Sequence, residues 1–438
     1  MVEATGTAQR AVGGARLGFV RAFMQATEVD TRLLGMVIAL AVIWVGFHLQ
    51  SNGLFLTPRN LWNLSVQTSS VAVMATGMVL VIVSRNIDLS VGSLMGFLGM
   101  VMGAFQARFI PQYLGLGFDQ PYTWILALAV GATLGAIVGA LQGFIIAFLE
   151  IPAFIVTLGG LLVWRGAAWW VATGQTIAPL DSTFQLLGGG AYGSIGATLS
   201  WIVGGLICVG IVLTIVSGRG QRRRFEFPLR PVWAEVTLAG IGCALTLGAV
   251  AVANAYPWPV GIARRYAEAN NIPWPEGGLV ISTGIAIPVL IAIVVAMAMT
   301  FVANQTRFGR YVFALGGNPE AADLGGINTR WVTVKIFILM GMLCALSAAI
   351  STARLNAATN ALGVLTELYV IAAAVIGGAS FAGGIGTVPG AILGALIMQS
   401  LQSGMVLMGI DAPMQNIVVG IVLVLAVGID TAYRKRAT

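Results

Sequence analysis

Long apolar runs separated by short polar segments are the dominant pattern of this chain. A helix that crosses the hydrocarbon of a membrane needs about 20 mostly apolar residues, and twelve runs meet or nearly meet that length. We therefore predict an all-α integral membrane protein, a polytopic helical bundle of about twelve transmembrane spans. The predicted spans are 33–49, 64–83, 90–107, 122–149, 152–172, 196–217, 236–256, 279–303, 332–353, 368–383, 387–408 and 414–430.

The same pattern divides the chain into three parts. Residues 1–32 form a polar arm, residues 33–430 the transmembrane domain and residues 431–438 a short tail. The first run is expected to remain as an anchor, because a signal peptide would be followed by small residues rather than by His48-Leu49-Gln50. The tenth run is short and ends in GGASFAGG, so a broken or re-entrant helix is an alternative there.

Composition agrees with this pattern. The chain is 58% hydrophobic and 9% charged, whereas soluble domains carry roughly 25% charged residues. A soluble enzyme, a disordered chain and a disulfide scaffold are therefore all disfavoured. The three cysteines lie inside apolar runs without metal-ligand spacing, so we interpret Cys208, Cys243 and Cys344 as packing residues.

The distribution of basic residues predicts the topology. If the N-terminus is cytoplasmic, sixteen of the 23 Lys and Arg residues fall in inside segments and five in outside segments. The excess of Lys and Arg marks cytoplasmic loops, so we predict that both termini are cytoplasmic. The basic segment Arg219–Arg230 is then a topology anchor with contacts to anionic membrane lipids as a secondary role. Nucleic acid is not expected as a partner, since no stacking aromatics accompany these charges.

Several kinds of chemistry are missing from the sequence. It has no G-x-x-x-x-G-K-[ST] segment to hold phosphates, one histidine, no CxxC and no HExxH. We therefore expect no catalytic residues, no metal site and no cofactor in this chain. Few ionisable residues lie inside the spans, which disfavours an ion-coupled carrier. Asp88 and Glu367 keep that alternative open.

Two polar groups near the ends of spans have both structural and functional interpretations. Asp88 or Ser90 could cap the helix that begins near Val91, or, with Asn86, could face a polar translocation path. Arg354, Asn356 and Glu367, together with Thr359 and Asn360, could form a solvated outer loop or a docking site for an external partner.

The segment 306–330 predicts a short helix in a cytoplasmic loop. Asn318 is a suitable N-cap, Pro319 suits the first helical position and Glu320 complements the helix dipole. Gly325 or Gly326 would end the helix after about two turns. Such a helix could insert into a groove of another protein, or it could be an ordinary connection between spans.

Three blocks give the chain a family resemblance. They are IDLSVGS (87–93), GRYVFALGGNPEAADLGGI (309–327) and VIGGASFAGGIGTVPGAILGALI (375–397). Together they resemble the permease subunits of bacterial ABC importers for monosaccharides, a family that includes ribose and xylose systems. The resemblance runs from about Leu33 to Asp430 and looks strongest for the xylose branch. The family core has about ten spans, and an insertion at 196–256 supplies two more here.

The resemblance implies partners that the chain itself lacks. Such permeases pair as homodimers, receive sugar from a periplasmic binding protein and are driven by a separate cytoplasmic ATPase that uses ATP and Mg. The expected location is the bacterial inner membrane.

The resemblance also implies roles for particular residues. Asn318–Ile327 would be the coupling helix that contacts the ATPase, with Arg307 and Arg310 beside it, and Asp88 and Ser90 would lie near the translocation path. Within the coupling helix Asn318, Ala321, Gly326 and Ile327 match the family's N-x-x-A-x-x-x-x-G-I pattern. The alternatives are an ion-coupled secondary transporter, an ABC permease for branched-chain amino acids and a membrane scaffold without transport. The sequence does not name the sugar.

Overall fold

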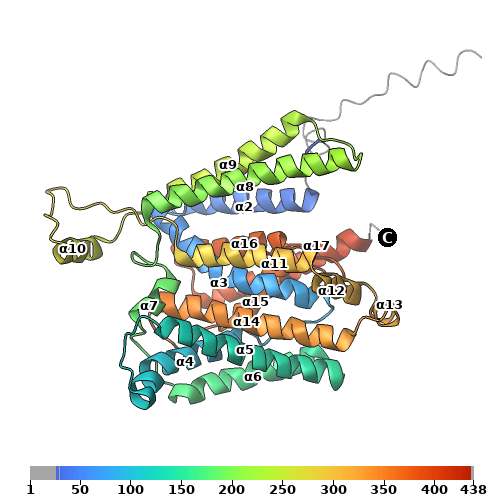
Figure 1. Cartoon of the computed structure of the whole chain (residues 1–438), viewed down its shortest axis with the longest axis horizontal. Helices are drawn as coiled ribbons and strands as arrows, with labels where there is room; N and C mark the ends of the chain where they lie inside the picture. The colour runs from blue at the N-terminus through green and yellow to red at the C-terminus, as the bar shows by residue number, and fades with distance from the viewer. Residues whose placement is uncertain (1–25, 29, 436–438) are drawn as a thin grey trace, which may run out of the picture. The chain divides into compact units, whose positions relative to one another are not determined.

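The computed structural model describes residues 26–28 and 30–435, and this part of the chain is built from helices (Figure 1). No strand occurs in the described ranges; they contain four isolated β-bridges. The first half holds α2 (Thr31–Gln50), α3 (Pro58–Val83), α4 (Val91–Ala104), the π-helix η1 (Phe105–Leu114), α5 (Thr123–Phe148), α6 (Ala153–Ala172), α7 (Ser182–Gln185), the 3₁₀ turn η2 (Leu186–Gly188) and α8 (Gly196–Arg224). The second half holds α9 (Val232–Asn254), α10 (Val260–Ala269), α11 (Ile287–Gln305), α12 (Arg307–Gly317), α13 (Pro319–Leu324), α14 (Thr329–Leu355), α15 (Thr366–Ile376), α16 (Val388–Leu407) and α17 (Ala412–Lys435).

The predicted fold class, a polytopic helical membrane protein, is confirmed. Ten helices of the described chain are long and apolar enough to cross a membrane, and each corresponds to a predicted span. Two further apolar helices, α15 and residues 412–428 of α17, are shorter. Twelve complete spans and the proposed limits of the insertion therefore stay predictions. Most of the predicted 1–32 arm lies outside the described residues, whereas residues 431–435 of the predicted tail belong to α17.

The predicted tenth span extends beyond the helix found there. The helix α15 ends at Ile376, seven residues before the predicted limit at 383. Gly377 follows at a point where an added methyl group would overlap the backbone of Gly390 and Ala391, and Gly378 has a φ of 93°. This close backbone approach and left-handed turn explain why the glycine-rich stretch leaves the helix.

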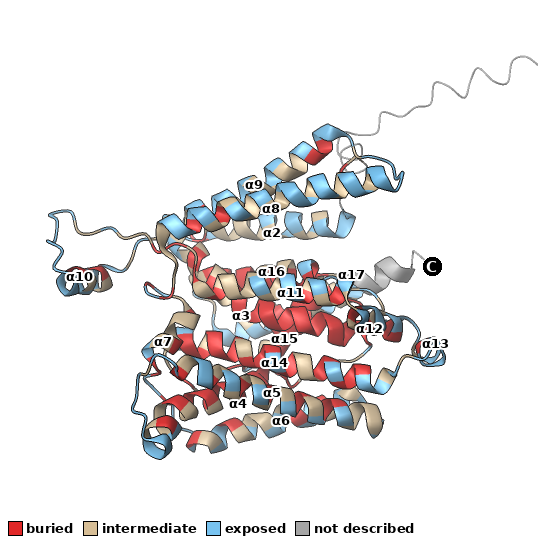
Figure 2. Ribbon diagram, viewed as in Figure 1, coloured by how far each residue is buried: buried red, intermediate tan, exposed pale blue. Residues whose placement is uncertain are grey.

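One unit of the chain, residues 36–201 and 250–438, contains the most buried helices. Figure 2 shows buried residues concentrated in α3, α14 and α15. Within this unit α5 and α14 pack backbone to backbone, because a methyl group at Gly341 would overlap the carbonyl oxygen of Gly135, and one at Gly139 would overlap that of Phe337. Small residues permit such close contact between membrane helices.

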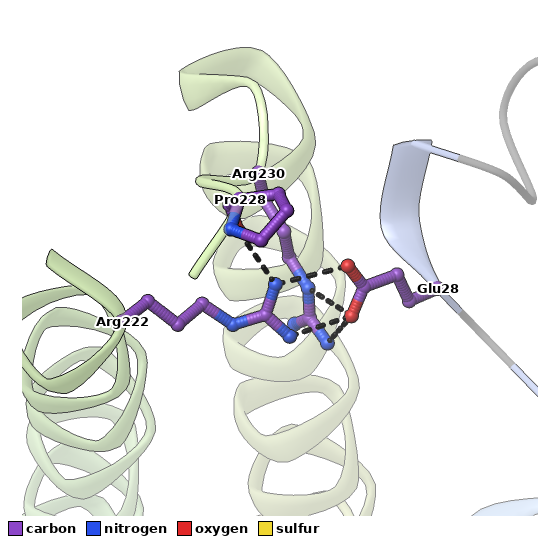
Figure 3. Close-up of polar contacts among 4 residues, drawn as sticks. All are labelled: Glu28, Arg222, Pro228 and Arg230. Carbon is purple, nitrogen blue, oxygen red and sulfur yellow. Dashed lines mark hydrogen bonds and ion pairs between the residues drawn. The ribbon is translucent and has the colours of Figure 1, made fainter. Parts of the chain in front are cut away.

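The other unit comprises residues 1–35 and 202–249, and its described part contains most of α8 and α9. Their charged ends are joined by ion pairs. Arg219 contacts Glu235 at 2.8 Å, and Glu28 contacts both Arg222 at 2.6 Å and Arg230 at 2.9 Å (Figure 3). Hydrogen bonds from these two arginines lower the pKa of the Glu28 carboxyl to about 2. This carboxylate therefore stays ionised throughout the physiological pH range.

The helix α10 was not predicted. It lies in a segment that the hydrophobic pattern indicated only as a loop between spans. Trp258, just before it, packs edge to face against Tyr192 and Tyr266 at centroid distances of 5.2 and 5.5 Å. These ring contacts give the segment a local apolar centre, which a search for 20-residue runs does not detect.

Candidate functional site

A polar face on α3 forms one wall of the candidate site. Pro58 is the first helical residue of α3, and the Thr57 side chain accepts a hydrogen bond from Asn60 N–H. The helix therefore begins six residues before the predicted span. This first part of the helix carries Asn60, Asn63, Gln67 and Ser70 at spacings of three, four and three. Residues at those spacings share one face of a helix.

Polar side chains of two other helices form hydrogen bonds with this face of α3. Ser347 and Ser351 of α14 contact the Ser70 hydroxyl at 2.7 and 2.8 Å. Ser403 of α16 donates a hydrogen bond of 3.1 Å to Asn60 Oδ1. These contacts fix the walls relative to one another.

Between these helices lies a cavity of about 610 Å³, within the usual range of roughly 300–1,000 Å³ for ligand pockets. Gln67, Gln399 and Gln402 line it, and their amide groups make no protein hydrogen bond with any described residue. Apolar side chains, among them Met95 and Ile350, complete the lining. The amides are thus available to hydrogen-bond water or a ligand.

The chemistry of the lining favours a neutral ligand rich in hydroxyl groups. It contains amides, hydroxyls and a single arginine, Arg354, and it contains no carboxylate. Amides can both donate to and accept from a hydroxyl, whereas a cation would call for acidic ligands. The apolar side chains can pack against carbon–hydrogen groups of the same ligand. Among the described residues there is also no group of three His, Cys, Asp or Glu side chains suited to a metal ion.

The predicted path residues form a separate polar cluster between α3 and α4. Asp88 is buried and accepts hydrogen bonds from Ser90 N–H at 2.9 Å and from the Ser90 hydroxyl at 2.6 Å. Gln142 of α5 donates to the same hydroxyl at 3.0 Å, while Asn86 donates to Ser84. Burial raises the pKa of the Asp88 carboxyl. None of these residues lines the cavity, and their transport role stays a prediction.

The capping interpretation of this cluster is refined by the structure. Ser90 is the N-cap residue of α4, but its side chain makes no capping bond to that helix. Asp88 instead binds the Ser90 backbone N–H and so closes the turn before the helix. A short polar side chain that binds a backbone group two residues on is a common turn device.

The predicted docking residues lie in different environments. Arg354 lines the cavity, and Asn356 ends α14 in a left-handed conformation while its Oδ1 accepts a 2.8 Å bond from Leu180 N–H. Glu367 is 7% exposed, so its side chain lies inside the protein rather than on a solvated loop. Arg165 of α6 holds the intervening loop by donating to the carbonyl oxygens of Asn360 and Leu362 at 3.1 and 2.9 Å.

The predicted short helix after Asn318 is present as α13. The Asn318 side chain accepts a 3.0 Å bond from Ala321 N–H, Pro319 is the first helical residue and Gly325 follows the last. Ala321 is exposed, as are Arg307 and Arg310 of the preceding α12. Sequence reasoning missed Leu324, which is 90% exposed. A partner protein that covered α13 would bury this apolar side chain, which favours association.

Apart from Arg354, which was predicted as a docking residue, the sequence reasoning also missed the residues that line the cavity. The signal was present in α3, where four polar residues share one face inside an apolar helix. The contribution of α14 and α16 had no such signal, because helices that begin more than 240 residues after the end of α3 meet it only in the folded chain.

Comparison with known proteins finds a family and several relatives that match most of the chain. Residues 60–427 match the protein family described as branched-chain amino acid transport system / permease component. The xylose transport system permease protein XylH of Haemophilus influenzae is 37% identical over 409 residues, covering 93% of this chain and 98% of that protein. XylH of Escherichia coli K12 is 34% identical and covers 94% of each chain. The ribose import permease protein RbsC of the same strain is 30% identical, with 91% of this chain and 92% of that protein covered. No solved structure matches this chain.

Proposed function

We propose a function from one premise: this chain belongs to the family described as branched-chain amino acid transport system / permease component. Within that family, it is the membrane subunit of a binding-protein-dependent ABC importer that brings a monosaccharide, xylose, into a bacterial cell. The observation that carries the proposal is the 34–37% identity to two xylose permeases along nearly the whole of each chain.

The lining of the cavity supports a sugar rather than an amino acid. A free amino acid carries both a carboxylate and an ammonium group at neutral pH. In the cavity lining, Arg354 could bind the carboxylate of an amino acid, but no carboxylate is present to bind its ammonium group. Its glutamine amides instead match the hydroxyl groups of a pentose, each of which can both donate and accept a hydrogen bond.

The energy source in this proposal is a separate ATPase. The sequence has no phosphate-binding loop of its own, so ATP and Mg belong to that partner. We place its contact at α13, where Ala321 and Leu324 are exposed. A second copy of the chain and a periplasmic sugar-binding protein complete the proposed assembly in the inner membrane.

Reconstitution tests this function. The chain is placed in liposomes with a candidate ABC ATPase and a candidate sugar-binding protein from the same genome, and uptake of radiolabelled xylose, ribose and leucine is measured. We expect xylose uptake that requires both ATP and the binding protein, and that persists when an uncoupler dissipates the ion gradients.

Each alternative gives a different result. Uptake that continues without the ATPase and stops with the uncoupler indicates an ion-coupled carrier. Uptake of leucine in preference to xylose indicates an amino-acid permease. A complex that moves none of the three substrates, although its ATPase hydrolyses ATP, contradicts the proposed substrate.

A further inference from the structure

The second residue after the end of α3 has an unusual backbone conformation. Asn86 N–H bonds to the Val81 carbonyl at 3.1 Å and Arg85 N–H bonds to that of Ile82 at 2.9 Å. This pair of bonds is the Schellman ending, in which Gly usually occupies the left-handed position. Here that position is Arg85, with a φ of 63°. A non-glycine residue costs free energy in this conformation and persists where the surrounding structure compensates for that cost.

The Arg85 side chain caps a different helix. Its Nε donates to the Gly316 carbonyl and its Nη2 to the Gly317 carbonyl, both at 2.7 Å. Gly316 and Gly317 are the last two residues of α12. The final carbonyl groups of a helix have no partner within it and carry the negative end of its dipole. The guanidinium group of Arg85 supplies hydrogen-bond donors for these carbonyl groups and a positive charge at the negative end of the helix dipole.

The backbones of the two helices also meet directly. A methyl group added at Gly316 would overlap the carbonyl oxygen of Val83, the last residue of α3. That oxygen accepts a 2.9 Å hydrogen bond from Gly384 N–H. We call these contacts of Val83, Arg85, Gly316, Gly317 and Gly384 the α3–α12 junction. Because the backbone of Gly316 lies directly against the Val83 carbonyl oxygen, the junction offers little room for one helix end to move without the other.

The junction connects the exposed α13 to the cavity. A single residue, Asn318, separates α12 from α13; its N–H bonds to Ala314 of α12 and its Oδ1 to Ala321 N–H of α13, each at 3.0 Å. On the other side of the junction, α3 runs for 26 residues and carries Gln67 in the cavity wall. At about 1.5 Å per residue, the 16 residues that follow Gln67, up to the end of α3 at Val83, span roughly 24 Å of one continuous helix.

We propose that Arg85 is a positioning residue, which transmits displacement of α12 and α13 to α3 and thereby to the cavity wall. The inference rests on the proposed function, because it requires an ATPase that moves α13. Arg85 touches neither the sugar nor ATP in this scheme. It determines how much of the ATPase movement reaches the sugar cavity.

The test measures how many sugars are imported per ATP hydrolysed. The reconstituted importer is prepared with wild-type chain, with Arg85→Gly and with Arg85→Lys. Glycine is favoured at a positive φ, so Arg85→Gly relaxes the backbone while removing the guanidinium group. We expect normal assembly and ATP hydrolysis but about fivefold or more fewer xylose molecules per ATP, the lower end of usual coupling energies. Arg85→Lys, which retains the charge and a donor, should recover part of the ratio.

A control variant and three distinct outcomes separate failure of this inference from failure of the proposed function. Asn271 has a φ of 53° in an exposed turn after α10, so Asn271→Gly makes the same backbone change elsewhere and should leave the ratio unchanged. If the wild-type importer moves no xylose, the proposed function itself is wrong. If the wild-type importer works and Arg85→Gly keeps the wild-type ratio, Arg85 does not couple the helices. Loss of ATPase binding by Arg85→Gly would show a role in docking alone and would also overturn the inference.

Discussion

At the scale of single residues, the walls of the cavity differ in how their polar groups are occupied. The serine hydroxyls on α3 and α14 bind one another, as Ser70 does with Ser347 and Ser351. The amides of Gln67, Gln399 and Gln402 have no protein partner among the described residues. The hydroxyls therefore hold the walls in place, and the amides are the groups that can recognise a ligand.

Replacing one of these amides should weaken sugar recognition. Gln399 is buried, and Gln399→Leu exchanges its amide for an apolar group of similar size. Leaving a sugar hydroxyl without its partner costs about 1–3 kcal/mol, so the KM for uptake should rise about tenfold. Gln305→Leu, at the end of α11 and outside the cavity, is the matched control. Equal KM values for the two variants would remove Gln399 from the recognition site.

At the scale of helices, local signals were predictable and contacts between distant helices were not. The start of α13 could be predicted, because an N-cap, a proline and an acidic residue are adjacent in sequence at Asn318–Glu320. A break at the GGASFAGG stretch was given as an alternative, but the end of α15 at Ile376 was missed, since it depends on the backbone of α16 lying against Gly377. The cavity was missed for the same reason. It requires faces of α3, α14 and α16 that only the folded chain brings together.

Because of the backbone contact between α5 and α14, Gly→Ala substitutions at two positions should have opposite effects on the stability of the fold. Gly341→Ala places a methyl group against the Gly135 carbonyl and should destabilise the fold by about 1–3 kcal/mol. Gly159→Ala lies in α6 with open space around it and should be neutral or stabilise by about 0.5–1 kcal/mol. Thermal unfolding of each variant in detergent measures the difference, and a Tm for Gly341→Ala at or above the wild-type value would contradict the contact.

The exposed face of α13 predicts a docking defect. Ala321→Glu adds a bulky charge to an exposed position, while alanine and glutamate differ little in helix propensity. Membrane insertion should be normal, whereas xylose uptake and copurification of the ATPase should fall together by roughly tenfold. Ala269→Glu, at the exposed end of α10, is the control. Full ATPase association in Ala321→Glu would rule out α13 as the contact.

At the scale of the whole molecule, the predicted orientation in the membrane rests on the distribution of charge alone. The sixteen basic residues expected inside include the cluster at the ends of α8 and α9, and the five expected outside include Arg264 and Arg265 of α10. Because Arg219, Arg222 and Arg230 are paired with carboxylates, part of this charge is neutralised in the folded state. The positive-inside rule acts during insertion, before such pairs form.

Chemical labelling tests this orientation. After the three native cysteines are replaced, Glu226→Cys in the α8–α9 turn and Thr438→Cys, which lies outside the described residues, should resist a membrane-impermeant maleimide in intact spheroplasts. Glu276→Cys, in the loop after α10, should react. All three should react once the membrane is permeabilised. The reverse pattern in intact spheroplasts would invert the topology.

Because Gly135 and Gly341 contact each other through their backbones, α5 and α14 should be exchanged together when parts of related permeases are combined. Each helix leaves no room for a side chain on the other, so their sequences cannot diverge independently at this crossing. A chimaera that takes α14 alone from a relative with a larger residue at the crossing would not assemble. One that takes α5 and α14 together would carry its own fitted surfaces. The natural unit of exchange between such permeases is therefore a pair of helices separated by 180 residues of chain.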